Sequence, residues 1–318
     1  MELSVIIPSH QPHRERLART LAGLRSQTLP VDRWETVLVD NASNPPVDAA
    51  ALADHAPRNL RLVPEPALGL TSARRTGFLA ARGNVVVLVD DDNVLAPDYL
   101  AEVVRLFAAH PAVGALGGRS LPEFETPMPA DLAEFIGLLA CRDLGPAPRL
   151  AALQRNPASG KIEYPECAPI GAGMALRRSS VQSWIDDQTA AAQPDRQGAA
   201  LTSGGDNDIV LRILRSGWSV GYFPTLSLLH LISAGRVDPD YLARLNRGIA
   251  RSWVQVLHKH DANPWPPVAP WTVRLRQVKA WFAHRAWSGD VSRIRWQGSY
   301  GHFLGLADIY YHRDNPSL

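Results

Sequence analysis

The chain has 318 residues, of which 46% are hydrophobic, so it is long and apolar enough to bury a sizeable core. Its formal net charge is +2, from 33 basic and 31 acidic residues, and this near balance gives no general case for a nucleic-acid partner. No run approaches the roughly 18 apolar residues of a transmembrane helix. The N-terminus lacks a signal-peptide pattern, and the two cysteines suggest neither a zinc site nor a disulfide framework. We therefore expect a cytoplasmic protein, with peripheral contact at the inner face of a membrane as an open alternative.

The first half of the chain alternates short β-branched runs with helical patterns. This alternation is typical of βαβ units, which build a mainly parallel sheet covered by helices on both faces. The predicted strands are 3–7, 35–39, 60–63, 85–89 and 113–116. Between them, Leu17, Leu21 and Leu24 recur at helical spacing, and so do apolar residues of 100–107. The sequence thus predicts an α/β fold.

The second half begins with an irregular stretch. Prolines become frequent from about 120 to 170, and we predict a connecting region there that faces a second substrate, the acceptor of a transferred group. Regular structure resumes with a predicted helix over 207–216, ended by Gly217, and with strands at 219–223 and 226–229. An apolar stripe predicts a long helix over 241–257. Residues 270–318 carry seven Lys/Arg and three Asp/Glu, so the basic excess lies in the tail.

An acidic run, Asp90-Asp91-Asp92, directly follows the most apolar predicted strand. In open α/β sheets, ligands bind beyond the carboxyl ends of such strands. Adjacent carboxylates repel one another unless a cation neutralises them, so the run indicates a hard divalent ion, Mn²⁺ or Mg²⁺, that bridges a diphosphate. The alternative is a solvated loop with helix-capping Asp residues.

Polar residues also follow the other predicted strands at this edge of the sheet. An acid after the second strand is suited to hydrogen-bond a base or a ribose hydroxyl, and an arginine where a loop enters a helix is suited to meet phosphate. The residues predicted to bind a nucleotide and its diphosphate at this edge, and thus the candidate donor-binding residues of the activity considered below, are Pro8, Ser9, His10, Asp40, Asn41, Arg74, Asp90, Asp91 and Asp92.

Several motifs then match one family in order and spacing. They are Ser4-Val5-Ile6-Ile7-Pro8, Val39-Asp40-Asn41-Ala42-Ser43, Ala73-Arg74, Leu88-Val89-Asp90-Asp91-Asp92, Gly171-Ala172-Gly173 and Gly204-Gly205-Asp206-Asn207-Asp208. Over about residues 1–235 the chain resembles the family 2 glycosyltransferases of the GT-A fold. The resemblance implies a central, mostly parallel mixed sheet flanked by helices, with a Rossmann-like nucleotide-binding half. It places a nucleotide-sugar-binding half at 1–120 and an acceptor-binding half at 121–235, and a helical C-terminal extension follows at 236–318.

The resemblance also implies an activity and roles for residues. The activity is inverting, metal-assisted transfer from a nucleotide sugar, with a UDP-sugar favoured, to the hydroxyl of a saccharide or lipid-linked acceptor. Asp40 would recognise the nucleoside, Asp91 and Asp92 would hold the metal, and Gly171, Ala172 and Gly173 would contact the acceptor. Gly205 replaces the glutamate that usually precedes the catalytic acid. Asp206 is therefore favoured as general base, Asp208 remains the alternative, and an inactive nucleotide-sugar-binding protein is the alternative function.

Two features of the second half, a late histidine and an apolar helical face in the tail, each have two possible interpretations. His230 follows the last predicted strand and is either a buried structural histidine or a ligand of the metal or diphosphate, with Arg236 behind it as a weaker phosphate candidate. Within 271–287, four apolar residues share one helical face among basic residues, namely Trp271, Leu275, Val278 and Phe282. This face either lies on an anionic membrane, or packs on the catalytic domain or in a homodimer, and packing is favoured.

Overall fold

The computed structural model describes residues 1–48, 50–187 and 204–312. Within these ranges a nine-stranded mixed sheet has the order β3-β2-β1-β4-β10-β6-β11-β5, with β7 also paired to β11, and β8 and β9 form a separate pair. The strands are β1 (Leu3–Ser9), β2 (Trp34–Asn41), β3 (Leu60–Glu65), β4 (Val85–Leu88), β5 (Asn93–Leu95), β6 (Val113–Phe124), β7 (Arg149–Ala151), β8 (Gln154–Arg155), β9 (Ile162–Glu163), β10 (Ala175–Arg177) and β11 (Ser219–Ile232). Strands β3, β2, β1 and β4 run parallel, and β10 is antiparallel to β4 and to β6.

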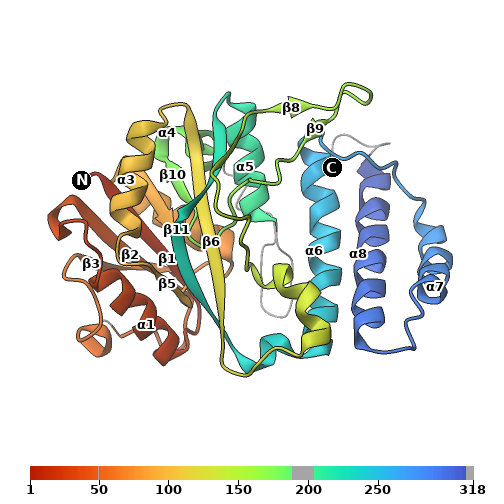
Figure 1. The fold of residues 1–318 in the computed structure, drawn as a ribbon, viewed down its shortest axis with the longest axis horizontal. Helices are drawn as coiled ribbons and strands as arrows, with labels where there is room; N and C mark the ends of the chain where they lie inside the picture. The colour runs from red at the N-terminus through yellow and green to blue at the C-terminus, as the bar shows by residue number, and fades with distance from the viewer. Residues whose placement is uncertain (49, 188–203, 313–318) are drawn as a thin grey trace.

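Helices cover the sheet and extend the fold at one end (Figure 1). The α-helices are α1 (Arg14–Arg25), α2 (Leu70–Ala80), α3 (Tyr99–Ala109), α4 (Arg178–Asp186), α5 (Gly205–Arg215), α6 (Pro239–Lys259), α7 (Val273–Ala283) and α8 (Asp290–His312). Short 3-10 helices are η1 (Val31–Arg33), η2 (Ala50–Leu52), η3 (Ala130–Leu139), η5 (Ala234–Val237) and η6 (Pro270–Thr272). In Figure 1 the sheet lies on the left, and α6, α8 and α7 stand beside it on the right.

The central strand β1 is buried on both faces because its side chains alternate. Leu3, Val5 and Ile7 belong to a hydrophobic cluster with residues of α1 and α3. Ile6 points the other way, into a second cluster that contains residues of α2, α4 and α5. A parallel sheet with helices on both faces requires such continuously apolar strands, so the predicted α/β architecture is confirmed.

The structure corrects several predicted boundaries. The strands predicted at 219–223 and 226–229 are one long strand, β11, whose register shifts between Tyr222 and Ser227. Pro224 lies in this interval, where a bulge tolerates the lost backbone donor. Strand β6 continues to Phe124, and the proline-rich stretch contains the ten-residue helix η3, which composition alone did not predict.

The C-terminal helices join the rest of the molecule through apolar contacts. A third cluster combines Leu132 and Phe135 of η3 with Leu242 and Leu245 of α6 and with Ile294 of α8. Among the described helices, none combines the length and apolarity needed to cross a bilayer. The predicted division at residue 235 falls inside η5 and stays a prediction.

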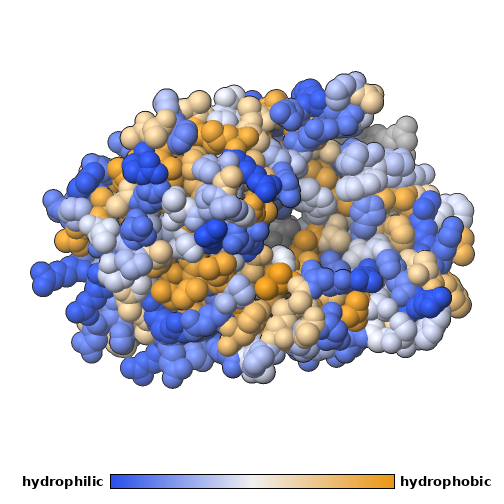
Figure 2. Space-filling model, in the orientation of Figure 1, coloured by the Kyte–Doolittle hydropathy of each residue, from blue (hydrophilic) through white to orange (hydrophobic). Residues whose placement is uncertain are grey.

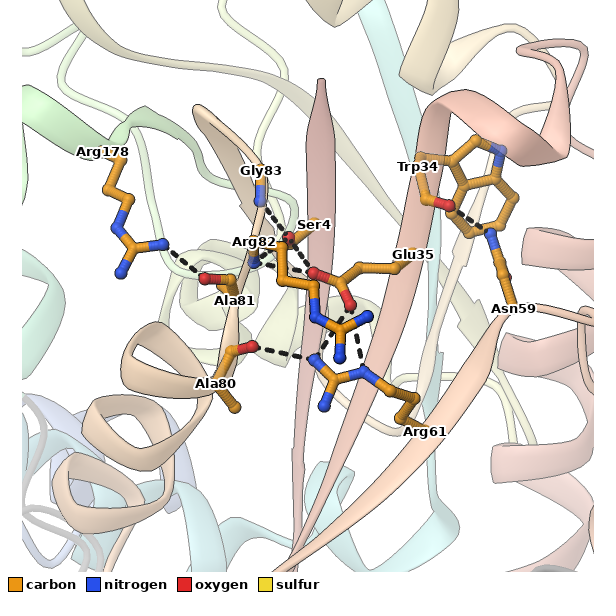
Figure 3. Close-up of polar contacts among 10 residues, drawn as sticks. All are labelled: Ser4, Trp34, Glu35, Asn59, Arg61, Ala80, Ala81, Arg82, Gly83 and Arg178. Carbon is orange, nitrogen blue, oxygen red and sulfur yellow. Dashed lines mark hydrogen bonds and ion pairs between the residues drawn. The ribbon is translucent and has the colours of Figure 1, made fainter. Parts of the chain in front are cut away.

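A buried carboxylate ties together the edge of the sheet at which β1, β2 and β3 begin (Figure 3). Glu35 Oε1 accepts hydrogen bonds from Ser4 Oγ at 2.8 Å and from the Arg82 amide at 2.7 Å, and Oε2 accepts one from Arg61 Nη2 at 2.9 Å. The Gly83 amide in turn donates to Ser4 Oγ at 2.8 Å. Burial raises the pKa of Glu35, but these donors outweigh it and hold the pKa below its ordinary value.

Replacing Glu35 by alanine should therefore destabilise the fold by about 2–4 kcal/mol, because buried donors lose their acceptor. The matched control is Glu2→Ala, which removes an exposed ion pair with Arg33 and should cost below about 1 kcal/mol. Urea unfolding of both variants measures the difference. Equal losses would contradict a special role for the buried carboxylate.

Candidate functional site

One pocket opens at the edge where the parallel strands end. Strand β1 ends at Ser9 and β2 at Asn41, and the acidic run follows β4, which pairs with β1 in parallel. The pocket is lined by Pro8, Ser9, His10, Asn41, Leu68, Leu70, Ala73, Asp90, Asp91, Asp92, Leu138, Leu139, Ala140, His230, Arg236, Tyr241 and Leu245. The structure thus brings together most of the predicted donor-binding residues.

The acids in this pocket interact closely with neighbouring polar and charged side chains. Asp91 Oδ2 accepts a hydrogen bond from Ser9 Oγ at 2.5 Å. Burial, together with the negative charge of Asp92, raises the pKa of Asp91 to about 6. Burial and the neighbouring carboxylates therefore disfavour the ionised form of Asp91, and a cation that enters the pocket would be stabilised by these acids.

Asp92 contacts His230 of the late strand β11 and Arg236, which follows that strand in η5. Its Oδ1 lies 3.3 Å from His230 Nε2, and its Oδ2 lies 3.2 Å from Arg236 Nη2. His230 is only 3% exposed, and its Nε2 also lies 3.3 Å from Arg236 Nη1. Strand β11 positions this histidine, because His230 pairs with Asn93 of β5, directly after Asp92. The structure therefore places His230 beside the acidic run, and this position is compatible with both interpretations of the residue.

The end of β2 is held by polar contacts to neighbouring loops. Asn41 Nδ2 donates to the Ala67 carbonyl at 2.7 Å, and His10 Nδ1 donates to the Asn41 carbonyl at 2.7 Å. Asp40 is 7% exposed and lies outside the lining of the pocket. Its Oδ2 accepts a hydrogen bond from the Val47 amide at 2.9 Å, so this carboxylate shapes the loop after β2.

Asp206 lies in the first turn of α5 and contacts α2, the helix whose residues Leu70 and Ala73 line the pocket. One carboxylate oxygen accepts a hydrogen bond from Arg74, the neighbour of the pocket residue Ala73 on α2. The other accepts from the Gly171 amide at 2.9 Å. A Cβ at residue 171 would lie 2.3 Å from Asp206 Oδ2, so only glycine allows this approach. The side chain of Asp206 is 27% exposed and thus remains accessible.

The other predicted glycine-motif residues are less accessible. Ala172 is 5% exposed, and the Gly173 carbonyl accepts a hydrogen bond from the Tyr99 hydroxyl at 2.6 Å. Gly173 has a φ of +74°, a left-handed conformation that suits glycine. The observed contact of this motif with the site is the one between Gly171 and Asp206.

Asp208 has a different environment from Asp206. Both acids lie outside the pocket lining, but Asp208 is only 2% exposed. It is bound by Lys259 Nζ at 2.8 Å, His260 Nε2 at 2.7 Å and Arg212 Nε at 3.2 Å. Burial raises its pKa, but hydrogen bonds from His260 and Lys259 overcome this and lower the pKa to about 2. These contacts describe a buried carboxylate that anchors α5 to the end of α6.

Sequence reasoning missed one wall of the pocket. Leu138, Leu139 and Ala140, at the end of η3, line it, and so do Tyr241 and Leu245 of α6. The signal for η3 was present in the sequence as apolar residues at helical spacing within 130–139, but the surrounding prolines obscured it. The placement of α6 over the pocket left no local signal.

The residues of this pocket fit a hard divalent ion. Within 1–48, 50–187 and 204–312, no three His, Cys, Asp or Glu side chains gather into a ready-made metal-binding group. Asp91 and Asp92 nevertheless present carboxylate oxygens to one pocket that also contains His230. Mg²⁺ is often held by one or two carboxylates, while water and substrate phosphates complete its shell. The protein groups therefore suit an ion that a bound diphosphate completes.

Replacing Asp208 by asparagine should destabilise the fold by about 2 kcal/mol at pH 7, as expected from a pKa lowered from 3.8 to about 2. A carboxylate with a lowered pKa stabilises the fold above its unfolded-state pKa, and this contribution disappears as the pH falls through the folded-state value. The difference from the parent should persist to about pH 4 and shrink between pH 4 and pH 2. Urea unfolding at pH 7, 4 and 3 tests this, with Asp261→Asn, at an exposed ion pair with Lys161, as control. A loss independent of pH would contradict the ionic explanation.

Comparisons with known proteins agree with this geometry. Residues 4–131 match the model of a family described as glycosyl transferase family 2. The O-antigen biosynthesis protein RfbC of Myxococcus xanthus is 33% identical over 147 residues, which make up 42% of this chain and 11% of that protein. The succinoglycan biosynthesis protein ExoW of Rhizobium meliloti is 31% identical over 103 residues, which make up 31% of this chain and 32% of that protein. The matched region therefore spans about a tenth to a third of the length of these relatives.

Among solved structures, the mannosyltransferase PcManGT from Pyrobaculum calidifontis, in complex with GDP-Man and Mn²⁺, has a TM-score of 0.55 at 19% identity. The likeness covers 99% of this chain and 88% of that chain, and it supports the predicted GT-A fold. The match to the family model, the curated relatives and the shared fold point to one conclusion. Residues 4–131 of this chain are similar to glycosyl transferase family 2, and the chain has a GT-A-like fold.

Proposed function

We propose that this protein transfers a sugar from a nucleoside diphosphate donor to an acceptor hydroxyl, with inversion at the anomeric carbon. The observation that carries the proposal is the single pocket into which the ends of β1 and β2, the acidic run after β4 and Arg236 all converge. Nucleotides bind at this edge of open α/β sheets. In this proposal residues 1–235 form the catalytic domain and 236–318 extend it.

The donor would lie with its diphosphate between the acidic run and Arg236. Asn41 and His10 line the other side of the pocket, where the nucleoside would bind above the loop that Asp40 orders. A UDP-sugar remains the first choice for the donor. GDP-mannose is the second, because the structurally similar PcManGT is a mannosyltransferase solved with GDP-Man.

Mn²⁺ or Mg²⁺ is the proposed cofactor, and Asp91, Asp92 and His230 are the proposed ligands. When bound, such an ion supplies positive charge that stabilises the departing diphosphate. Arg236 already contacts Asp92, at 3.2 Å, and is therefore a competing cation at one carboxylate of this set. With a donor bound, Arg236 is suited to turn to a phosphate oxygen, because a guanidinium binds phosphate well.

Asp206 is the proposed general base. It takes the proton of the acceptor hydroxyl while the acceptor oxygen forms its bond to the anomeric carbon and the bond from that carbon to the diphosphate oxygen breaks. The Gly171 amide and Arg74 orient the carboxylate, which has lone pairs left for the acceptor. Asp208 is proposed to hold α5 in place, since its carboxylate is buried among cations.

Replacing Asp206 by asparagine should reduce transfer at least about 100-fold, because the amide cannot accept the proton, and should leave donor affinity within about twofold. Product formation with purified nucleotide sugars gives the rate, and calorimetry gives the affinity. The control is Asp131→Asn, at an exposed acid of η3, which should behave as the parent. An active Asp206→Asn variant would remove the base assignment, and a parent protein that binds donors but never transfers or hydrolyses them would favour the inactive binding protein.

The cofactor proposal predicts opposite effects at two contacting residues. Asp92→Asn should weaken Mn²⁺ binding at least about tenfold, because a carboxylate ligand is lost. Arg236→Gln should strengthen Mn²⁺ binding in the absence of donor, because a competing cation is removed, and should weaken UDP binding. Calorimetry with Mn²⁺ alone and with UDP alone measures both effects. Unchanged Mn²⁺ affinity in both variants would exclude Asp92 as a ligand.

A further inference from the structure

The helix α7 presents an apolar face to solvent. Trp271 is 82% exposed, Leu275 70%, Val278 53% and Phe282 60%, and Trp287 beyond the helix is 57% exposed. We call these five residues the α7 face. Trp271 lies in η6, directly before α7, and the next three lie on α7. The four recur at spacings of four, three and four residues, so they lie along one side of this helical segment.

The opposite side of the same helix packs against the protein. Val273 is 8% exposed and Ala280 is also 8% exposed, and α7 contacts α8 on this side. Figure 1 shows α7 at the far right of the molecule, beyond α8, and Figure 2 shows hydrophobic colours reaching the surface at this end. The α7 face therefore points away from the sheet and its pocket, so the expected packing of this face on the catalytic domain does not occur in the described structure.

The α7 face is surrounded by positive charge. Residues 264–289 contain Arg274, Arg276, Lys279 and Arg285 and no Asp or Glu. Arg274 and Lys279 flank the apolar stripe on its two sides, as helical periodicity requires. In the part of the chain that the structure describes, none of these four cations forms an ion pair with a carboxylate.

We propose that the α7 face docks α7 in the plane of an anionic lipid bilayer. Tryptophan, leucine and phenylalanine enter the boundary between headgroups and acyl chains, while flanking Arg and Lys reach the anionic headgroups. Phe282 and Trp287, whose ring centroids lie 5.8 Å apart, form an aromatic end to the face. Large aromatic side chains favour this interfacial depth.

Charge argues against a second copy of the chain as the occupant. A symmetric dimer through the α7 face would bring two sets of four cations together with no acid from residues 264–289 to compensate them. An anionic bilayer offers both an apolar layer and negative charge over the whole length of the helix. Docking does not depend on the proposed transfer reaction, but it would bring the pocket near an acceptor that is anchored in lipid.

Co-sedimentation of the full chain with lipid vesicles tests the proposal. We expect binding to vesicles of phosphatidylcholine mixed with phosphatidylglycerol, at least about tenfold weaker binding to pure phosphatidylcholine, and weakening by salt. Trp271→Ser with Phe282→Ser should reduce binding at least about tenfold through lost apolar burial. Arg274→Glu with Lys279→Glu should reduce it at least as much by reversing the charge. The matched control is Leu79→Ser, at another apolar residue, 57% exposed, and it should bind as the parent does.

All of these substitutions alter exposed side chains, so circular dichroism and the thermal midpoint should stay unchanged. The proposal would be overturned if the parent protein binds anionic vesicles and both double variants bind them equally well. It would also be overturned if the parent protein binds neither kind of vesicle. Size-exclusion chromatography without lipid tests the alternative occupant of the α7 face, a second copy of the chain. A parent dimer that Trp271→Ser with Phe282→Ser dissociates, together with absent vesicle binding, would assign the α7 face to a second copy and reject the membrane.

Discussion

The candidate site depends on the parallel pairing of β1 with β2 on one side and with β4 on the other. Parallel strands end at the same edge of a sheet, so Ser9, Asn41 and the acids after β4 meet although they are distant along the chain. The pairing is stabilised at the opposite edge by Glu35, which holds Ser4, Arg61 and the Arg82 amide. A buried network at one edge thus supports a solvent-facing pocket at the other.

The first turn of α5 shows how one helix gives two carboxylates different environments. Asp206 and Asp208 are two residues apart, so they point about 200° apart around the helix. The side chain of Asp206 is 27% exposed beside Arg74, whereas that of Asp208 is 3% exposed beside Lys259 and His260. The geometry of the helix therefore separates an accessible acid from an anchoring one.

The C-terminal helices contribute to the pocket as well as extending the fold. Tyr241 and Leu245 near the start of α6 line the pocket, while Lys259 and His260 at its other end bind Asp208. Helix α8 packs on α6 and carries α7 on its outer side. One helix, α6, thus contacts both the pocket and the anchor of α5, and the helical extension connects this framework to the α7 face.

The sequence by itself determined the sheet class and the positions of the strands that carry the site. Apolar runs such as 85–89 are local signals, and polar residues at their ends follow directly from chain order. The tertiary structure alone decided which acids are accessible, because the exposure of Asp206 and Asp208 depends on Gly171, Arg74 and the end of α6. It also decided that η3 and α6 close the pocket and that the α7 face points outward. These features arise from contacts between distant segments. A periodic apolar stripe indicates that one face of a helix is suited to burial, but it does not indicate which distant segment covers that face.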